Sequence, residues 1–448
     1  MSNSINLKKG LDIPLAGMPD LAVKRTVLPD VVAVQPSDFK GLNPRLLVRE
    51  GDKVLAGSPV LADKKNPDIL VTSPVSGTVK EVVRGDKRKL LAVLVKADED
   101  QEYLDFSAPK DGLDAETVKE TLLKSGLWAA FIQRPYGIVA DPAAKPKAIF
   151  VSAFSTAPLA ADTEFTLGSE VAALQAGVSA LAKLAPVHVS VKSESSAFAK
   201  LADATIHVVK GKHPAGNVGV QIAAVSPIRK DETVWTVSLA LLAAVGRLFT
   251  TGRYDVRRTV AVGGPAVNGP AYVNALPGTP NTALKEFYAD ADGLRIISGD
   301  VLTGRNAGEA GYLGFYDTQV TVLKEGTEPE LLGWARPFRF NQYSADHTYF
   351  NWCLGRLGKE VSMDTNLHGG PRAFVMPDSY YAKYLPMDIY PLYLVKACLA
   401  GDIDNMEKFG IYEVLPEDFA LVEFMDPSKN YVQDIIANGI DLMLKEMA

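Results

Sequence analysis

Short apolar runs rich in valine alternate with turn residues along the N-terminal part of the chain. The strings VREGDKVLAG (residues 48–57) and SPVSGTV (residues 73–79) show this pattern most clearly. Glycine and proline interrupt each run before it reaches the length of a helix, and β-branched residues fill the runs. The pattern therefore predicts a series of short strands connected by tight turns.

A second pattern begins after an acidic segment without periodicity at residues 98–114. Apolar residues return at helical spacing with Val118, Leu122 and Leu123, so we expect a new domain to start there. The elements predicted next are a strand at 148–153, a helix at 170–184, strands at 187–191 and 206–209, and an apolar helix at 234–249. Because strand, helix and strand in this order form a right-handed parallel crossover, we predict a Rossmann-like α/β layer domain.

Residues 255–330 return to short strands, which are arranged around a single helix. The helix is predicted at 282–289, with Asn281 or Thr282 as its cap. The strands are predicted at 259–262, 271–275, 294–297 and 318–323.

From residue 378 onward the pattern is helical, most clearly at 389–399 and 431–447. This part is predicted to form a C-terminal helical unit. The acidic pair Glu417-Asp418 is interpreted as the solvent-exposed start of a helix without a catalytic role.

Composition and charge exclude several classes of protein. The chain has 448 residues, 47% of them hydrophobic, which is enough for more than one buried core. Its 47 Lys and Arg residues stand against 53 Asp and Glu residues, and no basic run is present, so we expect no nucleic-acid partner. The longest uncharged apolar stretch of helical character, residues 233–246, is shorter than the roughly 20 residues of a membrane span. Residues 1–10 lack the apolar core of a signal peptide, so we expect a protein that stays in the cytoplasm.

Cysteine and histidine are too few and too scattered for a metal centre. Cys353 and Cys398 are the only cysteines, whereas a protein-bound iron–sulfur cluster normally takes about four thiolates. None of the 5 histidines stands at ligand spacing from either cysteine. We expect neither an iron–sulfur cluster nor a bound metal ion, and no residue is assigned as a metal ligand.

A loop for the phosphates of a dinucleotide or flavin is also not found in the sequence. Such a loop brings backbone N–H groups close to the phosphates, and it needs closely spaced glycines at a helix start. The string FSTAPL (residues 154–159), after the first predicted strand of the α/β domain, has none. The pair Gly263-Gly264 precedes Pro265 and is expected to serve a turn between strands. No cofactor-binding residue and no catalytic residue is therefore assigned.

The strings at 48–57 and 73–79 resemble the biotinyl/lipoyl barrel-sandwich hybrid fold. In carrier proteins with this fold, a lysine at an exposed hairpin tip is acylated, which makes Lys64 and Lys65 candidates for a swinging arm. The match fails locally, because Asn66-Pro67 follows the lysines where the biotin type has methionine on both sides of its lysine. We expect an unmodified structural domain and keep a lipoyl/biotinyl-type carrier as an alternative.

The whole chain resembles one family, the A subunit of the bacterial sodium-translocating NADH:quinone oxidoreductase. The matching strings are KKGLDIP (8–14), DKKNP (63–67), RGDKR (84–88), SGLW (125–128), HPAG (213–216), RIISG (295–299) and YLG (312–314). The resemblance implies a multidomain protein of the α+β and α/β classes. Its expected parts are a biotinyl/lipoyl-like barrel-sandwich hybrid at 1–105, a Rossmann-like α/β domain at 106–254, a β-grasp (SLBB-like) domain at 255–335 and a mainly helical C-terminal domain at 336–448.

The function implied by this resemblance is that of a cytoplasm-facing peripheral subunit in a six-subunit membrane complex. The complex reduces ubiquinone with NADH and exports Na+, and its flavins and iron–sulfur centre lie in other subunits. This chain is then expected to be a translocase subunit with a structural or quinone-contacting role, without independent catalysis and without a redox cofactor of its own. A stand-alone NADH/flavin oxidoreductase is kept as a second alternative.

The same family resembles the flavin-bearing NADH-oxidising subunit of complex I and the C subunit of the Rnf complex, which bind flavin through glycine-rich loops. Where those relatives have such a loop, this chain reads LWAAFIQRP (residues 127–135). Trp128 and Phe131 add bulk where a phosphate-bearing ligand needs space. The resemblance therefore implies a scaffold that is kept without its cofactors.

The turn at residues 213–216 is the first candidate for contact with ubiquinone or a partner subunit. It contains His213, Pro214 and Gly216. An imidazole beside such a turn can donate a hydrogen bond to a quinone carbonyl. The alternative is a turn that only holds the preceding strand in place.

Aromatic residues form two further candidates. Trp128 and Phe131, together with Tyr136, can line an apolar slot for a quinone, although aromatics at this spacing also suit an ordinary core. The aromatic-rich run at 338–352 suits either a partner surface or core packing.

Overall fold

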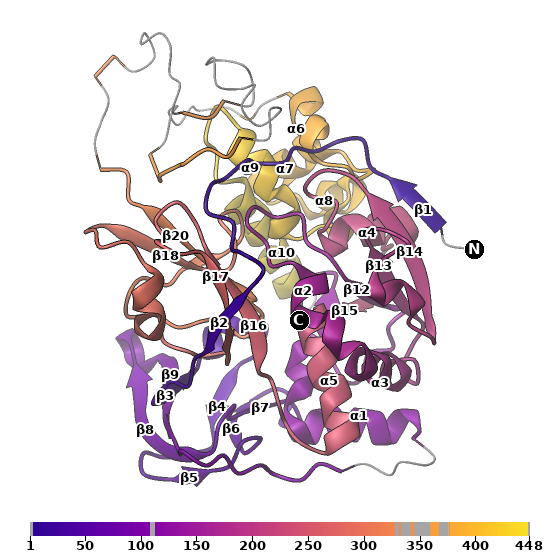
Figure 1. The fold of residues 1–448 in the computed structure, drawn as a ribbon. Helices are drawn as coiled ribbons and strands as arrows, with labels where there is room; N and C mark the ends of the chain where they lie inside the picture. Colours follow the sequence, from indigo (N-terminus) through magenta and orange to yellow (C-terminus); the bar gives the residue numbers. More distant parts are fainter. Residues whose placement is uncertain are drawn as a thin grey trace.

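The computed structural model describes residues 3–107, 113–327, 331–332, 342–344, 359–366, 375 and 377–446. In Figure 1 the purple strands of the N-terminal part lie at the lower left and an orange sheet lies above them. The magenta α/β layers lie on the right, and yellow helices lie at the top between these two sides. The chain is thus a multidomain protein that combines mixed sheets with helices, as the sequence predicts.

The barrel-sandwich unit consists of two small antiparallel sheets, with the orders β3-β9-β8-β5 and β4-β6-β7. Lys64 and Lys65 are exposed in the turn between β6 and β7. Gly77 has to be a glycine, because a Cβ there would lie 2.0 Å from the carbonyl oxygen of Lys96 on the neighbouring strand. The strands are β3 (Val31–Val34), β4 (Pro44–Leu46), β5 (Lys53–Val54), β6 (Pro59–Asp63), β7 (Leu70–Thr72), β8 (Gly77–Arg84) and β9 (Leu90–Ala97).

The α/β unit contains a seven-stranded sheet with the order β1-β14-β13-β12-β15-β10-β11. The run from β1 to β15 is parallel, while β10 and β11 are antiparallel additions. This arrangement confirms the predicted parallel crossover. The strands are β1 (Asn3–Asn6), β10 (Ile132–Arg134), β11 (Ile138–Val139), β12 (Ile149–Ser152), β13 (Val187–Val191), β14 (Ala204–Lys210) and β15 (Val234–Thr236). The helices are α1 (Ala115–Ser125), α2 (Thr163–Leu167), α3 (Val171–Leu181), α4 (Val218–Val225) and α5 (Leu239–Thr251).

The two faces of this sheet are covered by different helices. Val151 of β12 belongs to the core cluster that also contains residues of α3 and α5, whereas Phe150 packs in a second cluster with Ile222 of α4. Successive side chains of a strand point to opposite faces, so the alternation along β12 accounts for this division. The central strand β12 is therefore buried on both sides.

The single helix predicted at 234–249 is wrong at its start. The structure has the short strand β15, followed by α5, which begins at Leu239. Ser238 separates the two elements, and its side chain accepts a hydrogen bond from the backbone N–H of Leu241 as a helix cap. An apolar run that is buried on all sides has no periodicity that would separate a strand from a helix.

The β-grasp unit is built on a six-stranded sheet with the order β19-β18-β20-β16-β17-β2. A 3-10 helix, η6 (Asn281–Phe287), replaces the predicted α-helix. The predicted cap is also wrong, since Pro280 holds the cap position and the Asn281 side-chain amide donates to the carbonyl of Gly308 instead. The strands are β2 (Val23–Thr26), β16 (Arg258–Gly263), β17 (Ala271–Ala275), β18 (Leu294–Ser298), β19 (Arg305–Asn306) and β20 (Gln319–Lys324).

The residues before β3 belong to sheets of the other units. β1 pairs in parallel with β14, and β2 pairs in parallel with β17. The indigo segment between them crosses the molecule in Figure 1 from the α/β layers on the right toward the orange sheet on the left. This N-terminal segment therefore connects the α/β unit to the β-grasp unit.

The C-terminal unit is mainly helical from residue 378 onward, while the described residues 359–366 before it form no helix. Its helices pack around a core that includes Tyr381, Phe419 and Ile436. Cys353 and the aromatic run at 338–352, apart from residues 342–344, lie outside the described residues. The helices are α6 (Asp378–Tyr384), α7 (Pro391–Ala400), α8 (Ile403–Phe409), α9 (Ala420–Met425) and α10 (Val432–Glu446).

Candidate functional site

The strand order of the α/β sheet reverses at β12. The chain passes from β12 to β13 and β14 on one side, then returns to β15 on the other side of β12. In open α/β sheets, ligands bind outside the carboxyl ends of the strands at such a reversal. The segment after β12 and the turn after β14 are therefore the first place to look for a functional site.

The candidate turn at residues 213–216 lies at this place. Ser152, the last residue of β12, donates a hydrogen bond from Oγ to the carbonyl of Gly216 at 3.0 Å. Thr156, just after β12, accepts a hydrogen bond from the backbone N–H of Gly216 at 2.9 Å. A Cβ on Gly216 would lie 2.5 Å from the backbone nitrogen of Thr156, so this position has no room for a side chain. The turn is thus bound closely to the carboxyl end of β12.

His213 is almost completely buried in this turn, with 2% of its surface exposed. Its Nδ1 lies 3.2 Å from Thr156 Oγ1, and its backbone N–H donates to Asp12 Oδ1 at 2.9 Å. Nε2 is buried and has no hydrogen-bond partner among the described residues. Burial lowers the pKa of His213 below its ordinary value, although Asp300 and Asp12 act in the opposite direction. The imidazole is therefore neutral at physiological pH and has one unused nitrogen.

The N-terminal segment passes over the same turn. Leu11 donates its backbone N–H to the carbonyl of His213 at 2.9 Å. Gly10 approaches still more closely, because a Cβ there would lie 2.2 Å from the oxygen of His213 and 3.4 Å from Cδ of Pro214. Pro214 follows a cis peptide bond. Residues 10–12 therefore form one wall of the candidate site.

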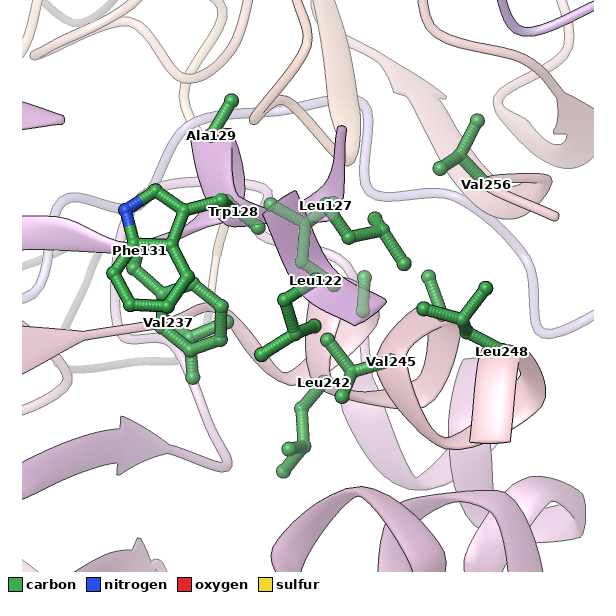
Figure 2. Packing of buried hydrophobic residues seen from close by; sticks show 14 of the residues in the cluster. Leu122, Leu127, Trp128, Ala129, Phe131, Val237, Leu242, Val245, Leu248 and Val256 are labelled. Atoms are coloured by element: carbon green, nitrogen blue, oxygen red, sulfur yellow. The ribbon is translucent and has the colours of Figure 1, made fainter. Parts of the chain in front are cut away.

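Trp128 and Phe131 lie in the hydrophobic core. Neither side chain is exposed, and their ring centroids are 5.7 Å apart. The indole Nε1 of Trp128 donates to the carbonyl of Ala140 at 2.8 Å, and the Trp128 ring meets Trp235 edge-on at 5.2 Å. Figure 2 shows both residues beside the aliphatic side chains of Val237 and Leu127. Their surroundings are those of packing residues.

Tyr136 does not join this pair. It packs edge-on against Tyr412 of the C-terminal unit at 6.5 Å and belongs to a different core cluster from Trp128. No described hydrogen bond or ring contact links Trp128 or Phe131 to His213. The HPAG turn at residues 213–216 therefore remains a candidate site, whereas Trp128, Phe131 and Tyr136 do not lie together around it.

The expectation that Glu417-Asp418 starts a solvent-exposed helix is wrong for Asp418. Its side chain is fully buried, and Oδ2 lies 3.1 Å from Nη1 of Arg134, which is only 1% exposed. Glu417 also pairs with Arg134 but keeps 41% of its side chain exposed. Burial alone would lower the pKa of Arg134, but the carboxylates of Asp418 and Glu417 raise it above its ordinary value. The sequence holds a signal for Arg134 alone, because it follows the apolar run at 127–132 and a buried guanidinium requires a carboxylate, but it does not indicate which carboxylate.

The described part of the chain holds neither a cluster of metal ligands nor a membrane-spanning helix. Within it, no group of three or more His, Cys, Asp or Glu side chains is arranged to hold a metal ion. Cys398 is a free cysteine there. The described helices include none that combines the length and the apolar character needed to cross a bilayer.

Three family models match successive parts of the chain. Residues 5–98 match the NqrA N-terminal barrel-sandwich hybrid domain, and residues 113–254 match the NqrA second alpha/beta domain. Residues 259–309 match a model described as the NQRA C-terminal domain, of the SLBB type. These matches agree with the sandwich, α/β and β-grasp units of the structure.

Relatives match the chain over its whole length. The A subunit of the Na(+)-translocating NADH-quinone reductase of Actinobacillus pleuropneumoniae serotype 5b is 37% identical over 99% of this chain and 100% of the relative. The A subunits from Haemophilus influenzae (strain 86-028NP) and Pasteurella multocida (strain Pm70) are each 36% identical with the same coverage. A solved NAD+-reducing [NiFe]-hydrogenase overlaps 47% of the chain at 13% identity with a TM-score of 0.34, which is too low to bear on the fold. Because three domain models match and the identity extends over the full length, the chain belongs to the family of the A subunit of the Na(+)-translocating NADH-quinone reductase.

Proposed function

We propose that this chain acts as a cytoplasm-facing, peripheral subunit of a six-subunit complex that reduces ubiquinone with NADH and exports Na+. In this proposal the chain carries no redox group of its own, and electrons travel on the cofactors of the partner subunits. The full-length identity to the A subunits of other bacteria supports the assembly with other subunits. The absence of a spanning helix from the described residues agrees with a peripheral position.

The proposal that this chain binds no nucleotide or flavin rests on the contacts of Thr156, which lies just after the carboxyl end of β12. A nucleotide phosphate at this place would need free backbone N–H groups and glycine-wide space. Thr156 Oγ1 instead accepts the N–H of Gly216, and the Thr156 backbone fills the space next to that glycine. A pyrophosphate therefore finds neither a free Gly216 N–H nor space beside that glycine.

The same contacts support one tautomer of His213. Thr156 Oγ1 accepts the Gly216 N–H and has one hydroxyl proton of its own, and we propose that it donates this proton to Nδ1 of His213. Nδ1 is then the acceptor and Nε2 carries the imidazole proton, which leaves a buried N–H donor without an acceptor among the described residues. A buried donor of this kind costs free energy until it meets an acceptor. We assign this acceptor to a ubiquinone carbonyl or to a backbone carbonyl of a partner subunit.

Labelling of the assembled complex with a photoreactive ubiquinone analogue, followed by peptide mapping, tests this site. We expect labelled peptides that contain residues 211–217 or the segment after β12. His213→Ala should reduce this labelling and raise the KM for ubiquinone several-fold, while electron transfer from NADH to an artificial acceptor stays unchanged.

The neighbouring exposed residue Lys212 provides the matched control. Lys212→Ala should leave both the labelling and the KM unchanged. Label found only in other subunits, together with an unchanged KM in His213→Ala, would remove the quinone contact from this chain and leave it a scaffold.

A further inference from the structure

The first turn of α4 lies directly against the buried carboxylate of Asp418. A Cβ on Gly219, the second residue of α4, would lie 2.5 Å from Asp418 Oδ2 and 2.6 Å from Oδ1. The same point is 2.4 Å from Nη1 of Arg134. Glycine at this position therefore lets an anion and a guanidinium approach the start of the helix.

The groups around this carboxylate form an anion-binding arrangement. Asp418 Oδ2 accepts hydrogen bonds from Arg134 Nη1 at 3.1 Å and from the backbone N–H of Leu415 at 2.9 Å. Asn217, at the cap position of α4, makes no side-chain cap, and its amide donates to the carbonyl of Glu417 instead. The N–H groups of the first helical turn have no acceptor within the helix, and they carry the positive end of its dipole. Arg134 Nη1, which belongs to a guanidinium that also pairs with Glu417, and the Leu415 N–H thus meet at Asp418 Oδ2, while the start of α4 lies beside both carboxylate oxygens at Gly219.

Two buried polar atoms beside the start of α4 lack hydrogen-bond partners among the described residues. Asp418 Oδ1 and Arg134 Nε are both buried, and neither has a hydrogen-bond partner among the described residues. Both side chains are more than nine-tenths buried. Asp418 is therefore held through one oxygen only, and Arg134 keeps one N–H that binds no described acceptor. The site offers more hydrogen-bond donors than Asp418 uses.

We propose that Arg134, Leu415 and the first turn of α4 form an oxyanion site, and that the chain fills this site with its own residue Asp418. The ligand class is a tetrahedral or planar oxyanion, such as a phosphate group or a carboxylate. The internal ligand comes from the C-terminal unit, while Arg134 and α4 belong to the α/β unit. The site therefore also fixes these two units to each other. This inference does not depend on quinone contact at His213.

Chemical rescue of the full-length chain tests the proposal. Asp418→Ala removes the internal carboxylate and leaves a space beside Arg134. We expect its unfolding temperature to fall by several degrees and to return toward the wild-type value with inorganic phosphate, saturably and beyond the effect of chloride at equal ionic strength. Formate should act in the same way. If the variant does not fold in chloride, its refolding yield in phosphate is the readout, and recovery only in phosphate or formate is expected.

Two further variants separate the site from a general salt effect. Asp418→Asn keeps the volume but not the charge, so it should be destabilised and should not respond to phosphate. Glu309→Ala removes the exposed partner of Lys285, away from Arg134, and should show no saturable response. The proposal is overturned if phosphate and formate give Asp418→Ala no gain over chloride, or if Asp418→Asn is as stable as the wild type.

Discussion

Nη1 of Arg134 lies 3.1 Å from Oδ2 of Asp418, although 284 positions separate the two residues in the chain. Arg134 ends β10 in the α/β unit, and Asp418 lies in the short helix η11 (Pro416–Phe419) before α9 of the C-terminal unit. Both side chains are buried, and a buried charge without a partner is energetically costly, so each charge is stabilised by the other.

The loss of one partner should therefore be costly. Arg134→Met leaves the Asp418 carboxylate buried without its cation, and we expect the free energy of unfolding to fall by about 3–5 kcal/mol. Urea denaturation measures this difference. Arg257→Met is the control, because Arg257 is 58% exposed where it pairs with Asp255, and exposed pairs contribute less than about 1 kcal/mol. Equal losses in the two variants would contradict a buried, interdependent pair.

A second prediction concerns the close contact between α3 and α5. A Cβ on Gly246 would lie 1.7 Å from the carbonyl oxygen of Ala173, so Gly246→Ala must push the two helices apart. We expect a loss of at least about 2 kcal/mol in the free energy of unfolding. Gly168→Ala is the matched control, since nothing lies within 4 Å of its Cβ position and its φ of -60° suits alanine. That variant should be neutral or more stable by up to about 1 kcal/mol.

A third prediction concerns Asp38, which links the barrel-sandwich unit to the β-grasp unit. Burial raises its pKa to about 6, while Arg305 and the backbone N–H of Phe315 act in the opposite direction. The folded state therefore binds the proton of the Asp38 carboxyl more tightly than the unfolded state does. The stability that this proton contributes to the fold is complete below the ordinary pKa of 3.8 and is lost as the pH rises through about 6.

Asp38→Asn should remove this part of the pH dependence. Between acidic and neutral pH, the free energy of unfolding of the wild type should fall by an additional amount of about 3 kcal/mol, which the variant does not lose. Identical slopes in both proteins would rule out Asp38 as the group responsible.

The fourth prediction separates packing from quinone contact at Trp128. Its ring is fully buried beside Phe131 and Trp235, so Trp128→Ala should lower the free energy of unfolding by about 3–5 kcal/mol. The milder Trp128→Phe should assemble into the complex with an unchanged KM for ubiquinone. A raised KM in that variant, at unchanged stability, would return Trp128 to the quinone site.

The fold was largely predictable because most elements carry a local signal. The alternation of Val187, Val189 and Val191 with His188 and Ser190 predicts β13 at the bounds that the structure has. The apolar stretch that holds β15 and α5 was predicted as one helix, since strand and helix look alike when every side is buried.

The candidate site was only partly predictable, because it depends on contacts between distant segments. The HPAG turn was found from its residue types, but its position at the end of β12 depends on the crossover and on Thr156. The burial of Asp418 was missed because an acidic pair before a helix resembles an ordinary exposed start. Its partner Arg134 lies in another domain, which no local pattern can reveal.

The central claim is that this chain transfers no electrons through a group of its own. The most direct test is the absorption spectrum of the purified full-length chain, combined with assays for extracted flavin, iron and acid-labile sulfide, and with its intact mass. We predict a colourless protein with absorption from aromatic residues alone, no stoichiometric cofactor, and a mass without an addition on Lys64 or Lys65. A yellow protein with one equivalent of flavin, or a brown one with acid-labile sulfide, would contradict the account.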